Sequence, residues 1–208
     1  MRPLAGFGAH RVLACAAVAI LGLAAGCQPK AARALFGPWE EGLTLAFEDP
    51  SLPQPQRSAD RLQLRVAHAT LNPGTDPLIQ LDLASARGQM SVLLRHQNGG
   101  IALVAEDGRV LSQTLPQGFP NTPSWTDRGT EFRIVGRATW EGAAILPATA
   151  DPVGIWVEAR PQSGPRRRTL YLPNLGEVES HEERDGAWVP VNRLVARGFT
   201  DIPAIKRR

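Results

Sequence analysis

The sequence contains two cysteines, Cys15 and Cys27, and none after them. Any domain that follows Cys27 therefore has no disulfide and no cysteine-based metal site. Aromatic residues are also few, at 6%. This argues against a transmembrane β-barrel, because such barrels carry girdles of aromatic residues at both membrane interfaces. The apolar run Val12–Ala25 has 14 residues, which is short of the roughly 20 that a membrane-spanning helix needs.

That run has the features of an export signal. Arg2 and Arg11 give the chain a positively charged start, and the uninterrupted apolar stretch Val12–Ala25 follows them. Its length falls within the ~7–15 residues of a signal-peptide apolar region. The stretch leads into the sequence Leu23-Ala24-Ala25-Gly26-Cys27.

Residues 23–27 resemble the lipobox of bacterial lipoproteins, in which small residues precede a cysteine that receives a diacylglycerol thioether. A small residue such as Gly26 gives the peptidase access, and a thiol is needed for the thioether. The resemblance implies that residues 1–26 are a lipoprotein signal peptide and that acylated Cys27 attaches the protein to a membrane. Two alternatives stay open, an ordinary signal peptide with an incidental Cys27 and a short N-terminal membrane anchor.

Gln28 follows the cysteine. In proteobacterial lipoproteins an aspartate at this position usually retains the protein in the inner membrane. The resemblance therefore favours the outer membrane, with the domain facing the periplasm.

The charge balance gives no indication of a nucleic-acid partner. The formal net charge is +3, and residues 1–26 contain two arginines and no acidic residue, so the mature chain carries only +1. Arg166-Arg167-Arg168 and Lys206-Arg207-Arg208 are interpreted as a solvated loop and tail. Contact with anionic lipid headgroups is the alternative.

The mature chain is interpreted as residues 27–38, the lipidated cysteine and its tether, residues 39–203, a single β-rich domain, and residues 204–208, a basic tail. No 11-residue window shows convincing helical periodicity. Apolar and polar residues alternate instead, as in half-buried strands. The predicted inward-facing sets are Leu43, Leu45 and Phe47; Leu62, Leu64 and Val66; Ile79, Leu81 and Leu83; Phe132 and Ile134; and Val153, Ile155 and Val157.

Tight turns connect several of these strands. Asn98-Gly99-Gly100, Asp107-Gly108 and Asp185-Gly186 predict hairpins, because Asn, Asp and Gly accept positive φ. About ten strands without helices must bury their apolar faces against one another. This predicts a mostly β fold with one curved antiparallel sheet, as a half-barrel or a barrel-like meander, with a sandwich as the alternative.

The C-terminal half resembles a known group of proteins. Leu115-Pro116 and Trp125 precede strands at Val135-Gly136 and Val153–Arg160, and a further segment then runs through Tyr171-Leu172-Pro173-Asn174-Leu175-Gly176 to a hairpin that ends at Asn192-Arg193-Leu194. Over residues 110–195 this order resembles the TapB-like group of bacterial envelope proteins. The resemblance implies a half-barrel similar to the LolA/LolB lipoprotein carriers and a place in the cell envelope, and it implies no biochemical activity.

No arrangement of residues points to catalysis. The chain has no Gly-x-Ser-x-Gly elbow and no Gly-x-x-x-x-Gly-Lys loop. Glu179, His181 and Glu183 would project in one row from a strand, about 6–7 Å apart, which is too spread for one metal ion. They are interpreted as a solvated charged strand edge. Accordingly no enzyme activity, cofactor or metal is expected.

Tryptophans are the candidates for a binding surface. In a concave sheet, Trp125 and Trp156 are predicted to line an apolar groove, the default binding site, with a fully packed core as the alternative. The leading hypothesis is a non-enzymatic, membrane-anchored envelope lipoprotein that binds an apolar ligand, or a lipidated or protein partner, in this groove. The second hypothesis is an accessory subunit of an envelope complex, and the third is a hydrolase with a scattered site.

Overall fold

The structure, a computed structural model, describes residues 36–70, 76–148 and 150–199. The chain divides into two compact units, residues 1–33 and 34–208, and the description below concerns the second. The predicted signal peptide, Cys27 and basic tail lie outside the described residues. Among those residues, no helix combines the length and the apolar character that crossing a membrane requires.

Within the described residues, twelve strands form one antiparallel sheet in the order β6-β5-β4-β3-β2-β1-β12-β11-β10-β9-β8-β7. Two runs of sequential strands, β1 to β6 and β7 to β12, are therefore joined by the pairing of β1 with β12. The strands are β1 (Thr44–Glu48), β2 (Leu62–Thr70), β3 (Leu78–Ser85), β4 (Gly88–Gln97), β5 (Gly100–Val104), β6 (Val110–Leu115), β7 (Ser124–Asp127), β8 (Thr130–Thr139), β9 (Val153–Arg160), β10 (Arg167–Leu172), β11 (Gly176–Arg184) and β12 (Ala187–Gly198).

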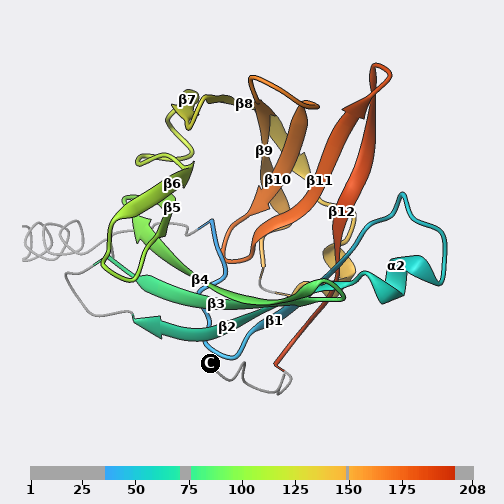
Figure 1. The fold of residues 1–208 in the computed structure, drawn as a ribbon, viewed down its shortest axis with the longest axis horizontal. Coiled ribbons are helices and arrows are strands. Elements are labelled where there is room, and N and C mark those ends of the chain that lie inside the picture. Colours follow the sequence, from blue (N-terminus) through green and yellow to red (C-terminus); the bar gives the residue numbers. More distant parts are fainter. Residues whose placement is uncertain (1–35, 71–75, 149, 200–208) are drawn as a thin grey trace, which may run out of the picture. The chain divides into compact units, whose positions relative to one another are not determined.

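A short helix, α2 (Gln56–Ala59), and a 3-10 turn, η1 (Ala143–Ile145), lie in the connections. Figure 1 shows β2, β3 and β4 running side by side, with β10, β11 and β12 rising steeply away from them. The strong coiling of the sheet brings its two halves over a common interior.

The sheet is a nearly closed barrel. Its end strands, β6 and β7, approach each other, and the Ser112 hydroxyl on β6 donates a 2.6 Å hydrogen bond to the Asp127 carboxylate on β7. The prediction of a mostly β, curved antiparallel sheet is confirmed. The barrel has more strands than the ten expected, and one of them, β7, has only four residues, which is too short for alternation to reveal.

The local signals in the sequence correspond to the observed elements. Asn98 and Asp185 have φ values of 49° and 51°, in the hairpins that connect β4 to β5 and β11 to β12. The predicted faces also meet across the sheet, since Leu45 is paired with Leu64 and Leu64 with Leu83.

Candidate functional site

A partly open apolar cavity of about 220 Å³, called the interior cavity below, is lined by both halves of the sheet. Six leucines from β1 to β4 form the largest group in its wall, and β6, β10, β11 and β12 contribute polar side chains. The apolar lining comprises Phe36, Pro38, Leu45, Phe47, Leu62, Leu64, Leu81, Leu83, Leu94, Ile101 and Leu175, and the polar lining comprises Thr114, Tyr171, Glu177 and Asn192.

Strand register explains why the leucines form one continuous surface. Leu45, Leu64 and Leu83 are direct partners across β1, β2 and β3. Neighbouring strands lie ~4.8 Å apart, and residues two apart on a strand share a face. The sequence therefore predicted these faces correctly, but the apolar groove that it predicted was assigned to Trp125 and Trp156 and not to these leucines.

Glu177 and Tyr171 form the polar side of the interior cavity and are paired across β10 and β11. One carboxylate oxygen of Glu177, Oε1, accepts hydrogen bonds from Asn192 Nδ2 at 2.8 Å and from the Ser180 hydroxyl. Burial, and secondly the Glu177 carboxylate, raise the pKa of the Tyr171 hydroxyl above its ordinary value. Tyr171 thus remains a protonated phenol on the cavity wall.

The segment Phe36–Pro38 closes one side of the interior cavity. It passes very close to the start of β11, where a β-carbon on Gly176 would lie 3.1 Å from Pro38 Cδ, and Gly176 has a φ of 81°. On the other side, a β-carbon on Gly37 would lie 2.8 Å from Cε1 of His96. Both positions require glycine, because a side chain would push this segment out of the wall.

His96 lies behind this segment as an unpaired buried imidazole. It is 1% exposed, and neither ring nitrogen has a hydrogen-bond partner within the described part of the chain. Burial lowers its pKa from 6.5 to about 4, so it is neutral near pH 7. Without a partner to orient it or to accept its proton, this histidine has no feature of a catalytic base.

The structure places the two predicted groove tryptophans elsewhere on the barrel. Trp125 on β7 stacks on Phe132, with ring centroids 5.0 Å apart, and lines a separate groove of about 450 Å³ beside β8. Trp156 on β9 contacts the ring of His181 and the guanidinium of Arg168. Neither tryptophan is among the residues that line the interior cavity, and their part in ligand binding stays a prediction.

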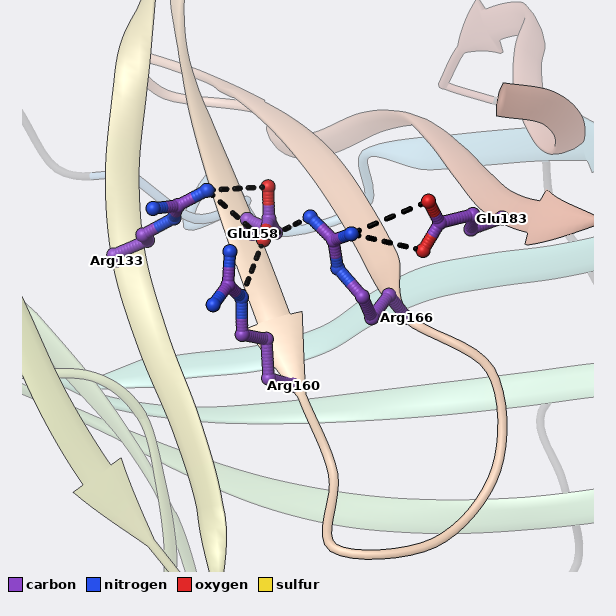
Figure 2. A network of polar contacts seen from close by, with 5 residues as sticks. All are labelled: Arg133, Glu158, Arg160, Arg166 and Glu183. Atoms are coloured by element: carbon purple, nitrogen blue, oxygen red, sulfur yellow. Dashed lines mark hydrogen bonds and ion pairs between the residues drawn. The ribbon is translucent and has the colours of Figure 1, made fainter. Parts of the chain in front are cut away.

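A charged network covers the face of β8 to β11 that carries Glu158 (Figure 2). Glu158 is 5% exposed and accepts hydrogen bonds from Arg160 and Arg166 at 2.7 Å and from Arg133 at 3.2 Å. Arg166 continues the network to Glu183. Burial by itself raises the pKa of Glu158, but the hydrogen bonds from the three arginines outweigh it and hold this pKa to about 2.

Glu158→Gln is expected to lower the free energy of unfolding at pH 7 by about 2 kcal/mol, because three arginines lose their shared carboxylate. This is less than the ~3–5 kcal/mol for a fully buried pair, since the three arginine side chains are 37–49% exposed and screened by water. Urea unfolding measures the change, with Glu131→Gln on β8 as the control. The stabilising effect of the ionised Glu158 is present above pH 4.5 and is lost as the pH falls through 2. A difference that persisted unchanged at pH 2 would contradict this assignment.

Glu179 and His181 are not on a solvated strand edge, as the sequence had suggested. β11 lies between β10 and β12, and Glu179 is 8% exposed. Its carboxylate lies 2.6 Å from Nε2 of His181 and 3.1 Å from a guanidinium nitrogen of Arg193. The expectation was wrong because residues on the neighbouring strands cover this row.

The described residues contain no group of three or more His, Cys, Asp and Glu side chains that could hold a metal ion. Of the histidines that the structure describes, His68 contacts Thr70 and Glu41, and His181 contacts Glu179 and Arg168. None of these contacts, nor the surroundings of His96, forms a serine–histidine–aspartate arrangement.

Comparison with known proteins gives two similar folds. No family model matches the chain, and no curated protein matches its sequence. One similar structure is a predicted exported protein with a YmcC-like fold from Bacteroides fragilis, with 16% identity over 79% of this chain and 99% of that chain and a TM-score of 0.48. Another is a predicted lipoprotein from Parabacteroides distasonis, with 11% identity over the same shares and a TM-score of 0.44. The resemblance to the TapB-like group stays a prediction.

Proposed function

We propose that this chain is an exported, non-enzymatic lipoprotein that is attached to a membrane through Cys27 and binds the alkyl part of a ligand in its barrel. The observation that carries the proposal is the interior cavity, an open space of about 220 Å³ with a leucine-rich wall. A closed hydrophobic core would fill such a space, because empty volume forfeits dispersion contacts. An apolar ligand supplies those contacts.

The size of the interior cavity indicates how much of a ligand it holds. An apolar cavity of ~150 Å³ takes one benzene molecule, so about 220 Å³ corresponds to an alkyl chain of roughly eight carbons. Pockets for whole drug-sized ligands are larger, ~300–1,000 Å³. The cavity therefore suits one alkyl chain, with the remainder of the ligand outside.

The short stretch of sequence between Cys27 and the cavity supports an envelope function. Cys27 precedes Phe36, a cavity-lining residue, by nine residues. Nine residues span at most ~30 Å when extended, so a lipid-anchored Cys27 keeps the cavity near the membrane surface. With Gln28 after the cysteine, we place the anchor in the outer membrane and the domain on its periplasmic side.

Displacement of a fluorescent apolar probe by 1-octanol tests the proposal. Leu83→Trp adds a large side chain to the cavity wall and is expected to weaken octanol binding by about tenfold or more, since the ligand and the indole compete for the same volume. The control is Leu111→Trp, because Leu111 is an exposed residue of β6.

A second variant changes the cavity in the opposite direction. Leu64→Ala enlarges the cavity. The alcohol that binds most tightly is therefore expected to change from one of about eight carbons to one with a longer chain. Circular dichroism verifies that each variant is folded. If alcohols of six to twelve carbons leave the wild-type probe signal unchanged, the proposed function is wrong.

A further inference from the structure

Among the described residues that line the interior cavity, Glu177 carries a negative charge and none carries a positive charge. Glu177 lines the cavity, and none of the ion pairs between described residues includes it. Its hydrogen-bond partners, Ser180 and Asn192, are neutral. A carboxylate beside leucines is costly unless it is paired with a cation.

Glu177 is half-buried, and two buried carboxylates of the same sheet show how this chain treats such charges. Glu158 is surrounded by three arginines, and Glu179 has Arg193 and His181 within 3.1 Å. Glu177 differs from both in its lack of a cation, and it is the one that faces the interior cavity. The difference indicates that the matching charge comes from the ligand.

The free oxygen of Glu177 is available for this contact. Oε1 receives both hydrogen bonds, whereas Oε2 receives none from the described residues, and Glu177 lines the cavity. Asn192 and Tyr171 line the same side and bring a carbonyl and a phenol oxygen. An ammonium group has three N–H donors and needs several acceptors of this kind.

We propose that the ligand of the interior cavity is a cationic amphiphile, with an alkyl chain against Leu45, Leu64 and Leu83 and a primary ammonium group hydrogen-bonded to Oε2 of Glu177. This inference rests on the proposed function, because it assigns the head of a ligand whose alkyl chain the leucines hold. It excludes a free fatty acid as the preferred ligand, because its carboxylate would meet Glu177 at close range.

The experiment compares three probes with the same chain, namely n-octylammonium, 1-octanol and octanoate, by displacement of the fluorescent apolar probe at pH 7. For the wild type, octylammonium is expected to bind about tenfold more tightly than octanol. The reason is that its ammonium group forms a charge-assisted hydrogen bond with the Glu177 carboxylate, which the octanol hydroxyl cannot do. Octanoate is expected to bind most weakly. In Glu177→Gln the preference for octylammonium over octanol should disappear, because the amide carries no charge to pair with the ammonium group. Glu106→Gln, which removes an exposed carboxylate outside both the interior cavity and the Trp125 groove, should keep the wild-type order.

The outcomes separate this inference from the proposed function. If octanol fails to bind, the proposed function itself is overturned. If octanol binds but octylammonium binds no more tightly, or octanoate binds best, only the assignment of a cationic head to the ligand is refuted. The same assignment is refuted if Glu177→Gln keeps the full preference for octylammonium. Should Glu177→Gln not fold, the order of the three probes on the wild type decides alone.

Discussion

Replacing Cys27 with alanine is expected to move the protein from the membrane fraction to the soluble fraction. The thioether forms on the cysteine sulfur, and each buried methylene of an acyl chain contributes ~0.8 kcal/mol to membrane attachment, so two or more chains anchor a protein firmly. Intact mass and fractionation measure the effect. Wild-type protein should have the mass of residues 27–208 plus its acyl groups.

Cys15 provides the matched control for this experiment. It lies inside the apolar run of the signal, so Cys15→Ala should leave both acylation and membrane attachment unchanged. An unmodified, soluble wild-type protein would show that the export signal is of the ordinary type and that Cys27 is incidental. In that case the interior cavity would belong to a secreted or periplasmic domain.

Mild acid is expected to destabilise the barrel through His96. The pKa of this histidine in the folded protein is about 4, below its ordinary value of 6.5. Between these two values the unfolded chain binds more protons than the folded chain, so stability falls as the pH decreases. The contribution of neutral His96 is fully present above pH 6.5 and is lost by pH 4, a change of about 3 kcal/mol in the free energy of unfolding.

Urea unfolding between pH 7 and pH 4.5 tests this prediction. His96→Phe keeps a ring in the site but cannot be protonated, so its stability should change much less over this range. The exposed His68 is the control, because His68→Gln should retain the wild-type dependence. Protonation of Glu158 changes the free energy of unfolding mainly below pH 4.5, which is outside the pH range of this experiment. Parallel pH profiles for wild type and His96→Phe would rule out His96 as the cause.

Much of the fold was predictable from short stretches of sequence. The alternation of Leu62 and Leu64 on β2, and of Leu81 and Leu83 on β3, predicted faces that the structure confirms as cavity lining. The turn at Asp185-Gly186 was equally clear, because its positive φ values suit these residues. Such signals are local, since they depend on a residue and its near neighbours along the chain.

The candidate site was predictable only in part. Trp125 and Trp156 were chosen by residue type, whereas the interior cavity is lined mainly by other apolar residues, seven of them leucines. Glu177 gave no signal, because a single glutamate on a strand is ordinary until its surroundings are known. Likewise the row of Glu179 and His181 suggested an edge, and only the placement of β11 between β10 and β12 showed that it is covered.

The sequence by itself determined the β character of the chain, most of the inward faces of its strands and its hairpin turns, whereas Val153, predicted to face inward, is exposed; the export signal stays a prediction. The tertiary structure alone decided that β1 pairs with β12, that the sheet nearly closes, and that the space between its halves is left open beside an unpaired carboxylate. The physical reason is the range of the interactions. Alternation and turn preference act over a few residues, whereas barrel closure, cavity volume and ion pairing depend on side chains far apart in the chain.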